Sequence, residues 1–338
     1  MGYMKKEFYS LTIFDCLNKP DIDLNYFPGW TRKAVTFTMD DGIRQHDEKF
    51  LNTVRPSGIL GTFNLYNVDL SKADEYRELY AGYGIASHCN YHANVFKDGV
   101  DYSELITDDP WPGAATADTS KIYKHPSVEG LYYHFVTGYS WHPIADTEHY
   151  LEFAMQTEVE IEQIFGEGVV KGFVYPNGNQ SNQAVVDFLR ENGYTNIRRT
   201  YPLAGDNFSM PETRYSWSYN ADHTNLLSMM KKFEAAPDDG ELKMFSFGVH
   251  PKDFETNNKW EDLYIFAATY GYRPDDYFYG TVDDIFAQED AIKSATVEGD
   301  VVVNNSYTTE IYFKVNDKKV KLTPRSSYNT ETGEIYAI

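Results

Sequence analysis

Short apolar runs that alternate with helix-like stretches limit most strongly what this chain can fold into. The runs are rich in β-branched or aromatic residues and lie at 33–38, 61–66, 84–87, 171–176, 244–250 and 277–281. Stretches with helical patterning separate most of them. Strands that alternate with helices indicate βαβ units and a mostly parallel sheet. Six or seven such units predict an α/β fold that closes, or nearly closes, into a barrel.

The pattern changes at two places along the chain. Residues from about 98 to 146 contain Pro, Gly and many aromatic residues, and a loop of this length inside a domain is typically functional. We interpret it as an insertion that flanks the site. From residue 296 onward, alternating residues and turn signals without a helix predict a small β appendage. The expected domains are therefore 1–295 and 296–338.

The charge balance limits the ligands of this chain. Its 338 residues include 30 Lys and Arg against 51 Asp and Glu, a net charge of -21, which opposes binding to nucleic acid or anionic membranes. A neutral or cationic ligand fits better, and the aromatic content of 16% suits stacking under sugar rings. No run approaches the roughly 18 apolar residues of a membrane span.

Two cysteines and the N-terminal sequence bear on localisation. Cys16 and Cys89 alone make no disulfide framework. The first residues show no signal peptide, because acidic residues and a Pro interrupt them. We expect a cytoplasmic protein, or a secreted or cell-surface one if a signal has been removed.

Polar residues follow several of the predicted strands. Asp40 and Asp41 come after the first run, His88 after the third, residues 175–178 after the fourth, and His250 at the end of a later one. The carboxyl ends of the strands of a (β/α) barrel meet on one rim, where such folds carry their active sites. The sequence therefore predicts a site at this rim.

His88 and His92 stand four residues apart, a spacing that lets two imidazoles bind one metal ion. With Asp41 they form two neutral imidazoles and one carboxylate, a set that leaves positions open for water and substrate. We expect one divalent ion, Zn first, with Co, Ni or Mn as alternatives. Asp40 can then take a proton from the attacking water, although exchanged roles for the two aspartates are a distinct hypothesis.

Acyl hydrolysis also needs an oxyanion donor and an acid for the leaving group. The backbone N–H of Asn177 in the turn YPNG is the candidate donor, and His250 is the candidate acid. The sequence contains no GxSxG nucleophile elbow, no GxxxxGK[ST] phosphate loop and no CxxC pair.

Four motifs, TFTMDDG, SHCNYH, FVYPNG and SFGVHP, resemble in this order those of the polysaccharide deacetylases, the NodB-homology group of carbohydrate esterase family 4. The resemblance extends from about Tyr26 to Ile292, and the flanking residues look like the bacterial branch. It implies a distorted (β/α) barrel of about seven strands with a small C-terminal β appendage, and metal-dependent removal of acetyl groups from glycans.

The resemblance also implies roles for individual residues. It makes Asp40 the general base and His250 the acid, with Asp41, His88 and His92 as the metal ligands. In many members an Arg of the third motif tethers the base, whereas this chain has Val174 there, so Arg199 is our candidate substitute. The expected substrate contacts are Tyr175, Trp217 and His223.

The expected function is metal-dependent removal of N-acetyl or O-acetyl groups from an acetylated glycan or oligosaccharide. One alternative is an amidohydrolase of a non-sugar amide, because fold and motif do not fix specificity. Another is a glycan-binding protein with a vestigial site. The sequence fixes neither the sugar nor the oligomeric state.

Overall fold

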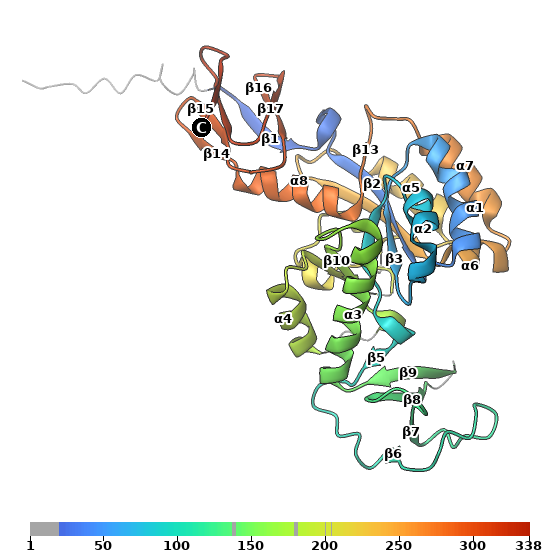
Figure 1. Cartoon of the computed structure of the whole chain (residues 1–338). Helices are drawn as coiled ribbons and strands as arrows, with labels where there is room; N and C mark the ends of the chain where they lie inside the picture. The colour runs from blue at the N-terminus through green and yellow to red at the C-terminus, as the bar shows by residue number, and fades with distance from the viewer. Residues whose placement is uncertain (1–19, 137–139, 179–181, 200, 204) are drawn as a thin grey trace, which may run out of the picture. The chain divides into compact units, whose positions relative to one another are not determined.

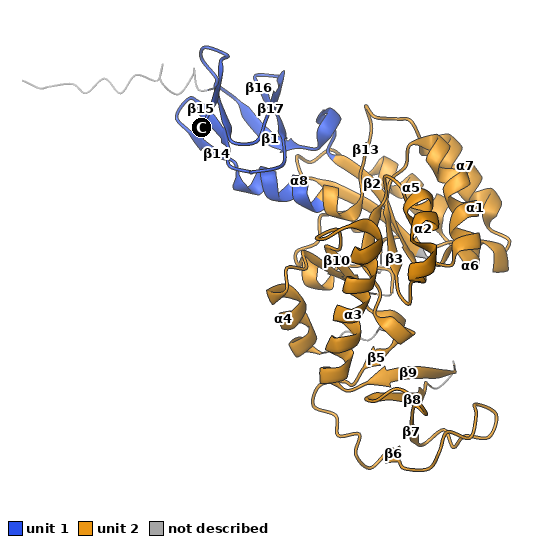
Figure 2. Ribbon diagram, viewed as in Figure 1, with its two compact units in different colours: residues 1–32, 286–338 blue, residues 33–285 orange. Residues whose placement is uncertain are grey.

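The computed structural model describes residues 20–136, 140–178, 182–199, 201–203 and 205–338. Two compact units make up the chain (Figure 2). Unit 1 takes the residues up to Arg32 together with Phe286–Ile338, and unit 2 is Lys33–Ile285. Cys16 lies outside the described residues, and Cys89 is a buried free thiol.

A seven-stranded parallel sheet forms the centre of unit 2 (Figure 1). Its strand order is β11-β10-β4-β3-β2-β12, and β13 pairs with the beginning of β2. The strands are β2 (Lys33–Asp40), β3 (Thr62–Leu65), β4 (Gly84–Ser87), β10 (Gly172–Val174), β11 (Asn196–Arg198), β12 (Lys243–Val249) and β13 (Phe278–Tyr279). The expected α/β fold with a distorted barrel is confirmed.

An irregular segment, residues 217–221, connects the two edge strands of this sheet. Trp217 bridges to Arg198 of β11, and Ala221 bridges to Phe247 of β12. Backbone hydrogen bonds support both contacts, from Arg199 N–H to the Trp217 carbonyl at 2.8 Å and from Gly248 N–H to the Ala221 carbonyl at 2.9 Å. The barrel is therefore closed by a segment that is not a regular strand.

Helices follow most of the strands, as βαβ units require. They are α1 (Arg44–Val54), α2 (Ala73–Leu79), α3 (Thr147–Phe165), α4 (Gln183–Glu191), α5 (Leu226–Ala235), α6 (Pro251–Thr256), α7 (Trp260–Tyr270) and α8 (Val282–Ser294). Side-chain caps begin α3, α4 and α8, because Asp146 accepts from the His149 N–H, Asn182 from the Val185 N–H and Thr281 Oγ1 from the Asp284 N–H. Within the described ranges, none of the helices has the length and apolarity needed to cross a membrane.

Aromatic side chains fill the space between the sheet and its helices. Phe37 of β2 contacts Phe50 of α1 and Phe63 of β3, with ring centroids 4.9 and 5.4 Å apart. Gly61 must lack a side chain, since a Cβ there would lie 2.3 Å from the Phe37 ring. Seven of the eight residues of β2 are buried, so the strand lies inside the domain. Asp40 is its last residue.

The expected insertion folds into a five-stranded sheet of its own, in the order β5-β9-β8-β7-β6. Its strands are β5 (Asn94–Val95), β6 (Ile106–Thr107), β7 (Ile122–Lys124), β8 (Leu131–Phe135) and β9 (Trp141–Ala145). The sheet begins two residues after His92, so it is anchored beside the predicted metal ligands. The position of this segment could be predicted from the sequence but its strands could not, because they have only two to five residues each.

Unit 1 is a β module that draws on both ends of the chain. The C-terminal strands are β14 (Thr296–Glu298), β15 (Val301–Asn304), β16 (Ile311–Val315), β17 (Lys318–Leu322), β18 (Ser326–Asn329) and β19 (Ile335–Ala337). The N-terminal strand β1 (Ile22–Tyr26) pairs antiparallel with β16. The described residues 20–32 therefore belong with the appendage, whereas the sequence places them in the barrel domain.

Candidate active site

Asp40 ends strand β2 and is buried within a network of hydrogen bonds. The Asn64 amide donates to its Oδ1 at 2.7 Å, and the Arg198 guanidinium pairs with the same oxygen. Burial alone would raise the pKa of Asp40, but the charge and hydrogen bond of Arg198, together with the charge of His250, outweigh it and hold the pKa well below its usual range. Asp40 is consequently an ionised carboxylate at any working pH.

The sequence predicts Arg199 beside Asp40, but the arginine at this position in the structure is its neighbour Arg198. Arg198 lies on β11 with a fully buried side chain. Arg199 is exposed, and its Nε donates to Ser216 Oγ at 2.7 Å. Successive residues of a strand point to opposite faces, so only one of the two arginines can point toward Asp40.

Asp41, His88 and His92 come together, with one ligand atom of each lying within 4.8 Å of the others. Oδ1 of Asp41 is 3.8 Å from Nε2 of His88 and 3.5 Å from Nε2 of His92. Among the described residues, neither this oxygen nor Nε2 of His88 has a hydrogen-bond partner, although both are buried. Buried polar atoms without partners are costly. Their convergence, with a donor set of two imidazoles and a carboxylate, therefore fits a divalent cation.

Hydrogen bonds on the other ring nitrogens orient both histidines. Nδ1 of His88 donates to the Val174 carbonyl at 2.9 Å, which leaves Nε2 without a proton. Nδ1 of His92 lies 3.2 Å from the Asn177 amide nitrogen. Burial lowers the pKa of His88, and burial together with His88 lowers the pKa of His92 to about 3. Both rings are therefore neutral, as metal ligands must be.

Unusual backbone conformations cluster at the same place. Asp41, His92 and Asn177 have positive φ values of 79°, 51° and 51°. Such conformations are unfavourable for residues with a Cβ and persist where the surrounding structure fixes them. Three loops at the carboxyl ends of strands thus share a strained geometry that aims side chains at one point.

His250 follows β12 and faces the same centre. Its Nδ1 donates to Asp253 Oδ2 at 2.9 Å, and its Nε2 lies 3.6 Å from Oδ2 of Asp41. Burial alone would lower the pKa of His250, but the hydrogen bond to Asp253 and the charges of Asp41 and Asp40 raise it overall. Lys252 also reaches this centre, and its Nζ donates to Oδ2 of Asp41 at 2.8 Å.

The three expected substrate contacts have different positions. Tyr175 and Trp217 are each 2% exposed and belong to the core, so we do not retain them as substrate contacts. Trp217 instead donates from Nε1 to Asn196 Oδ1 at 3.1 Å. His223 is half-buried, with its ring centroid 6.3 Å from that of Phe254.

Sequence reasoning missed four residues of this centre, namely Asn64, Arg198, Lys252 and Asp253. Asn64 sits on β3 beside Asp40, a pairing that depends on strand register. Asp253 lies three residues after His250 in the first turn of a helix, a spacing that could have indicated it. The strand alternation around the buried Ile197 would have separated Arg198 from Arg199.

Comparison with known proteins decides the family. A sequence model described as polysaccharide deacetylase matches residues 29–197, half of the chain. The chain belongs to the polysaccharide deacetylase family. No match was found among curated proteins.

Solved structures of this polysaccharide deacetylase family also match, at low identity. A CE4 esterase from Streptococcus mutans is 14% identical with a TM-score of 0.41, and the match covers 74% of this chain and 86% of that one. A family 4 carbohydrate esterase from Bacillus anthracis is 13% identical with a TM-score of 0.39, covering 78% and 87%. The chitin deacetylase of the fungus Colletotrichum lindemuthianum is 14% identical with a TM-score of 0.39, covering 75% and 87%.

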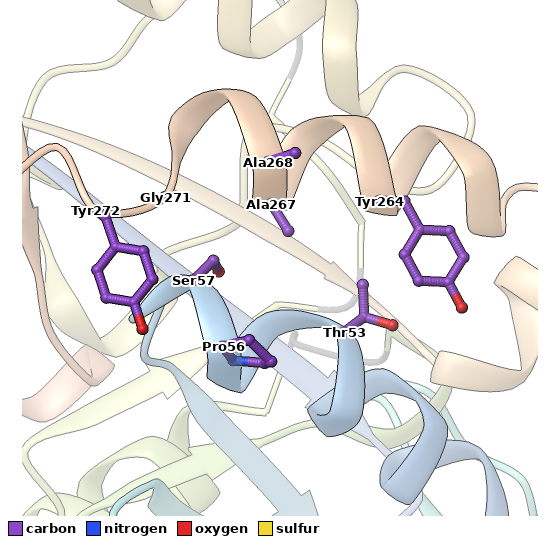
Figure 3. Close-up of a pocket in the computed structure, with 8 residues that line it drawn as sticks. All are labelled: Thr53, Pro56, Ser57, Tyr264, Ala267, Ala268, Gly271 and Tyr272. Carbon is purple, nitrogen blue, oxygen red and sulfur yellow. The ribbon is translucent and has the colours of Figure 1, made fainter.

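A separate groove of about 400 Å³ lies between η3 (Arg55–Ser57) and α7. Figure 3 shows Tyr264 and Tyr272 at its two ends, with small residues of α7 and the end of α1 between them. It is lined by Thr53, Pro56, Ser57, Tyr264, Ala267, Ala268, Gly271 and Tyr272, none of them charged. The groove shares no residue with the candidate site.

Proposed function

We propose that this protein is a metal-dependent hydrolase that removes acetyl groups from an acetylated carbohydrate. The observation that carries the proposal is the convergence of the unpartnered Oδ1 of Asp41 with the imidazoles of His88 and His92, beside an ionised Asp40 and a His250 of raised pKa. When bound there, a divalent ion would supply Lewis acidity, which polarises a carbonyl and lowers the pKa of water to about 7.

Asp40 is the proposed general base, which accepts a proton from the attacking water. Arg198 and Asn64 hold its Oδ1, so the carboxylate is fixed in orientation. The same contacts lower its basicity, and the proton transfer therefore depends on acidification of the water. In this proposal Asp41 is the metal ligand, and Asp40 does not bind the metal.

His250 is the proposed general acid. Asp253 accepts from its Nδ1 and keeps its Nε2 pointed toward Asp41. A raised pKa keeps the imidazole protonated over a wider pH range, which suits donation to the departing amine or alkoxide. The backbone N–H of Asn177, held in a positive-φ turn, is the proposed oxyanion donor.

The test is acetate release by protein reconstituted with Zn, compared with the same protein treated with a chelator. Oligomers of N-acetylglucosamine, peptidoglycan fragments and acetylated xylan together separate amide from ester substrates. We expect chelator-sensitive release from at least one of them. If the metal-bound protein released acetate from none of the three substrates, the result would contradict the proposal and favour a non-sugar amide substrate or a binding function.

A further inference from the structure

Asp41 presents its two carboxylate oxygens to different surroundings. Oδ1 faces the imidazoles of His88 and His92 and has no hydrogen-bond partner among the described residues. Oδ2 accepts from Lys252 Nζ at 2.8 Å. The Asp41 side chain is 7% exposed and that of Lys252 is 39% exposed, so the carboxylate lies largely out of water while the lysine is partly solvated.

The position of Lys252 on its helix does not by itself explain this contact. Lys252 is the second residue of α6, and a cation in the first turn of a helix gains nothing from the helix dipole. The backbone turn after His250 carries the lysine to Asp41, from which it is separated by 211 residues along the chain. The ion pair therefore joins the loops that follow β2 and β12.

A lysine on a metal-binding carboxylate has two effects. By occupying Oδ2, which also lies 3.6 Å from Nε2 of His250, it leaves Oδ1 to face the imidazoles of His88 and His92, and this orients the ligand. Its positive charge also neutralises Asp41 when no metal is present and repels a dication that shares the same carboxylate.

We propose that Lys252 is a positioning residue that holds Oδ2 of Asp41 and acts as an internal substitute for the metal charge, so that it stabilises the metal-free protein and weakens metal binding. The inference rests on the metal site of the proposed function and adds a residue that competes for one of its ligands. Lys252 would thus favour metal binding by orienting Asp41 and oppose it by repelling the cation, and the repulsion would be the larger effect.

The test is titration of metal-free protein with zinc chloride in a competing chelator, for wild type and Lys252→Met. We expect Lys252→Met to bind zinc about tenfold more tightly, because the repulsion is removed. The metal-free variant should melt at a lower temperature than the metal-free wild type, and zinc should raise its melting temperature by more. Neither readout requires turnover.

Two further variants separate this role from a general effect of losing a lysine. Lys252→Arg keeps the positive charge and should restore affinity and melting temperature toward wild type. Lys49→Met removes a lysine of similar exposure, 43% against 39%, whose partner is Glu255 on the surface. We expect it to leave the zinc affinity unchanged.

The possible failures are distinguishable. If zinc binds wild type and Lys252→Met equally, or binds the variant more weakly, the inference on Lys252 is overturned while the metal site stands. If zinc binds neither protein, the metal site of the proposed function fails, and the inference fails with it.

Discussion

The polar centre around Asp40 and Asp41 and the groove between η3 and α7 lie near opposite ends of helix α1, yet they have little in common. The centre contains buried charges, backbone strain and unpartnered polar atoms. The groove contains open volume, uncharged side chains and two tyrosines that are 51% and 71% exposed. Ligand sites are often sought as cavities with apolar walls, a description that suits the groove better.

Open volume and chemical reactivity are therefore separate properties in this protein. Shifts in pKa follow from charges held out of water, and those charges require a packed environment more than an open one. The candidate site is therefore recognised by its electrostatics. Substitutions in the polar centre should change turnover or stability, whereas substitutions in the groove should change turnover little.

The largest expected effect is on turnover, from Asp40→Asn. The amide keeps an oxygen for Arg198 and Asn64 but cannot accept the proton, so kcat should fall about a thousandfold. Zinc affinity should stay close to that of wild type, because Asp40 is not a proposed ligand. Near-normal kcat in a zinc-loaded variant would refute Asp40 as the base.

The next largest effect is on stability, from Arg198→Met. Removing one partner of a buried ion pair leaves the other charge uncompensated, which typically lowers the free energy of unfolding by about 3–5 kcal/mol. The neighbouring Arg199→Met is the matched control, and at an exposed position it should change this free energy by less than about 0.5 kcal/mol. Urea denaturation of both variants makes the measurement. Equal losses would show that Arg198 has no special relation to Asp40.

A pH-dependent effect is expected from Asp47, which lies on α1 between the two regions. Burial raises the pKa of Asp47 to about 7, and Tyr80 donates to its Oδ2 at 2.5 Å. The folded protein holds this proton up to about pH 7, whereas the unfolded chain releases it near the ordinary value of 3.8. Wild-type stability should therefore fall as the pH rises between these values.

The variant that tests this is Asp47→Asn, which keeps an acceptor for Tyr80 but cannot ionise. At pH 8 it should be more stable than wild type by on the order of 3 kcal/mol, and by much less at pH 5. Urea denaturation at the two pH values measures the difference. A stability difference that does not vary with pH would mean that Asp47 titrates normally in the folded state.

The smallest effect is expected in the groove, from Tyr264→Ala and Tyr272→Ala. Both rings are exposed and neither contacts the polar centre. On a short soluble oligosaccharide, kcat/KM should stay within about twofold of wild type. A large loss of kcat/KM on this substrate would show that the groove takes part in the reaction.

The sequence predicted the polar centre well where it depends on strand ends. Strands β2, β4 and β12 are apolar runs with clear boundaries, so Asp40, Asp41, His88 and His250 could be placed on one rim. Strand β11 escaped detection because it has three residues and carries a buried arginine, which looks like surface in a sequence. The choice of Arg199 over Arg198 followed from that omission.

Features that depend on long-range pairing could not be predicted in the same way. Strand β1 joins the appendage through β16, some 290 residues later, and no local pattern encodes that partner. The contact between Lys252 and Asp41 likewise depends on two loops that meet only after β2 and β12 have paired side by side. Local periodicity predicts individual helices and strands, whereas strand register and closure of the barrel depend on the assembled sheet.

The segment of residues 217–221 has a consequence for how the protein loses activity. Because it closes the barrel through isolated bridges, its amides should exchange with solvent sooner than those of β2. Arg199 N–H bonds to Trp217 within this closure, one residue from the guanidinium that pairs with Asp40. A partial opening of residues 217–221 would therefore separate Asp40, the proposed base, from Arg198 while most of the barrel is still folded. Loss of the proposed activity on heating would then precede global melting.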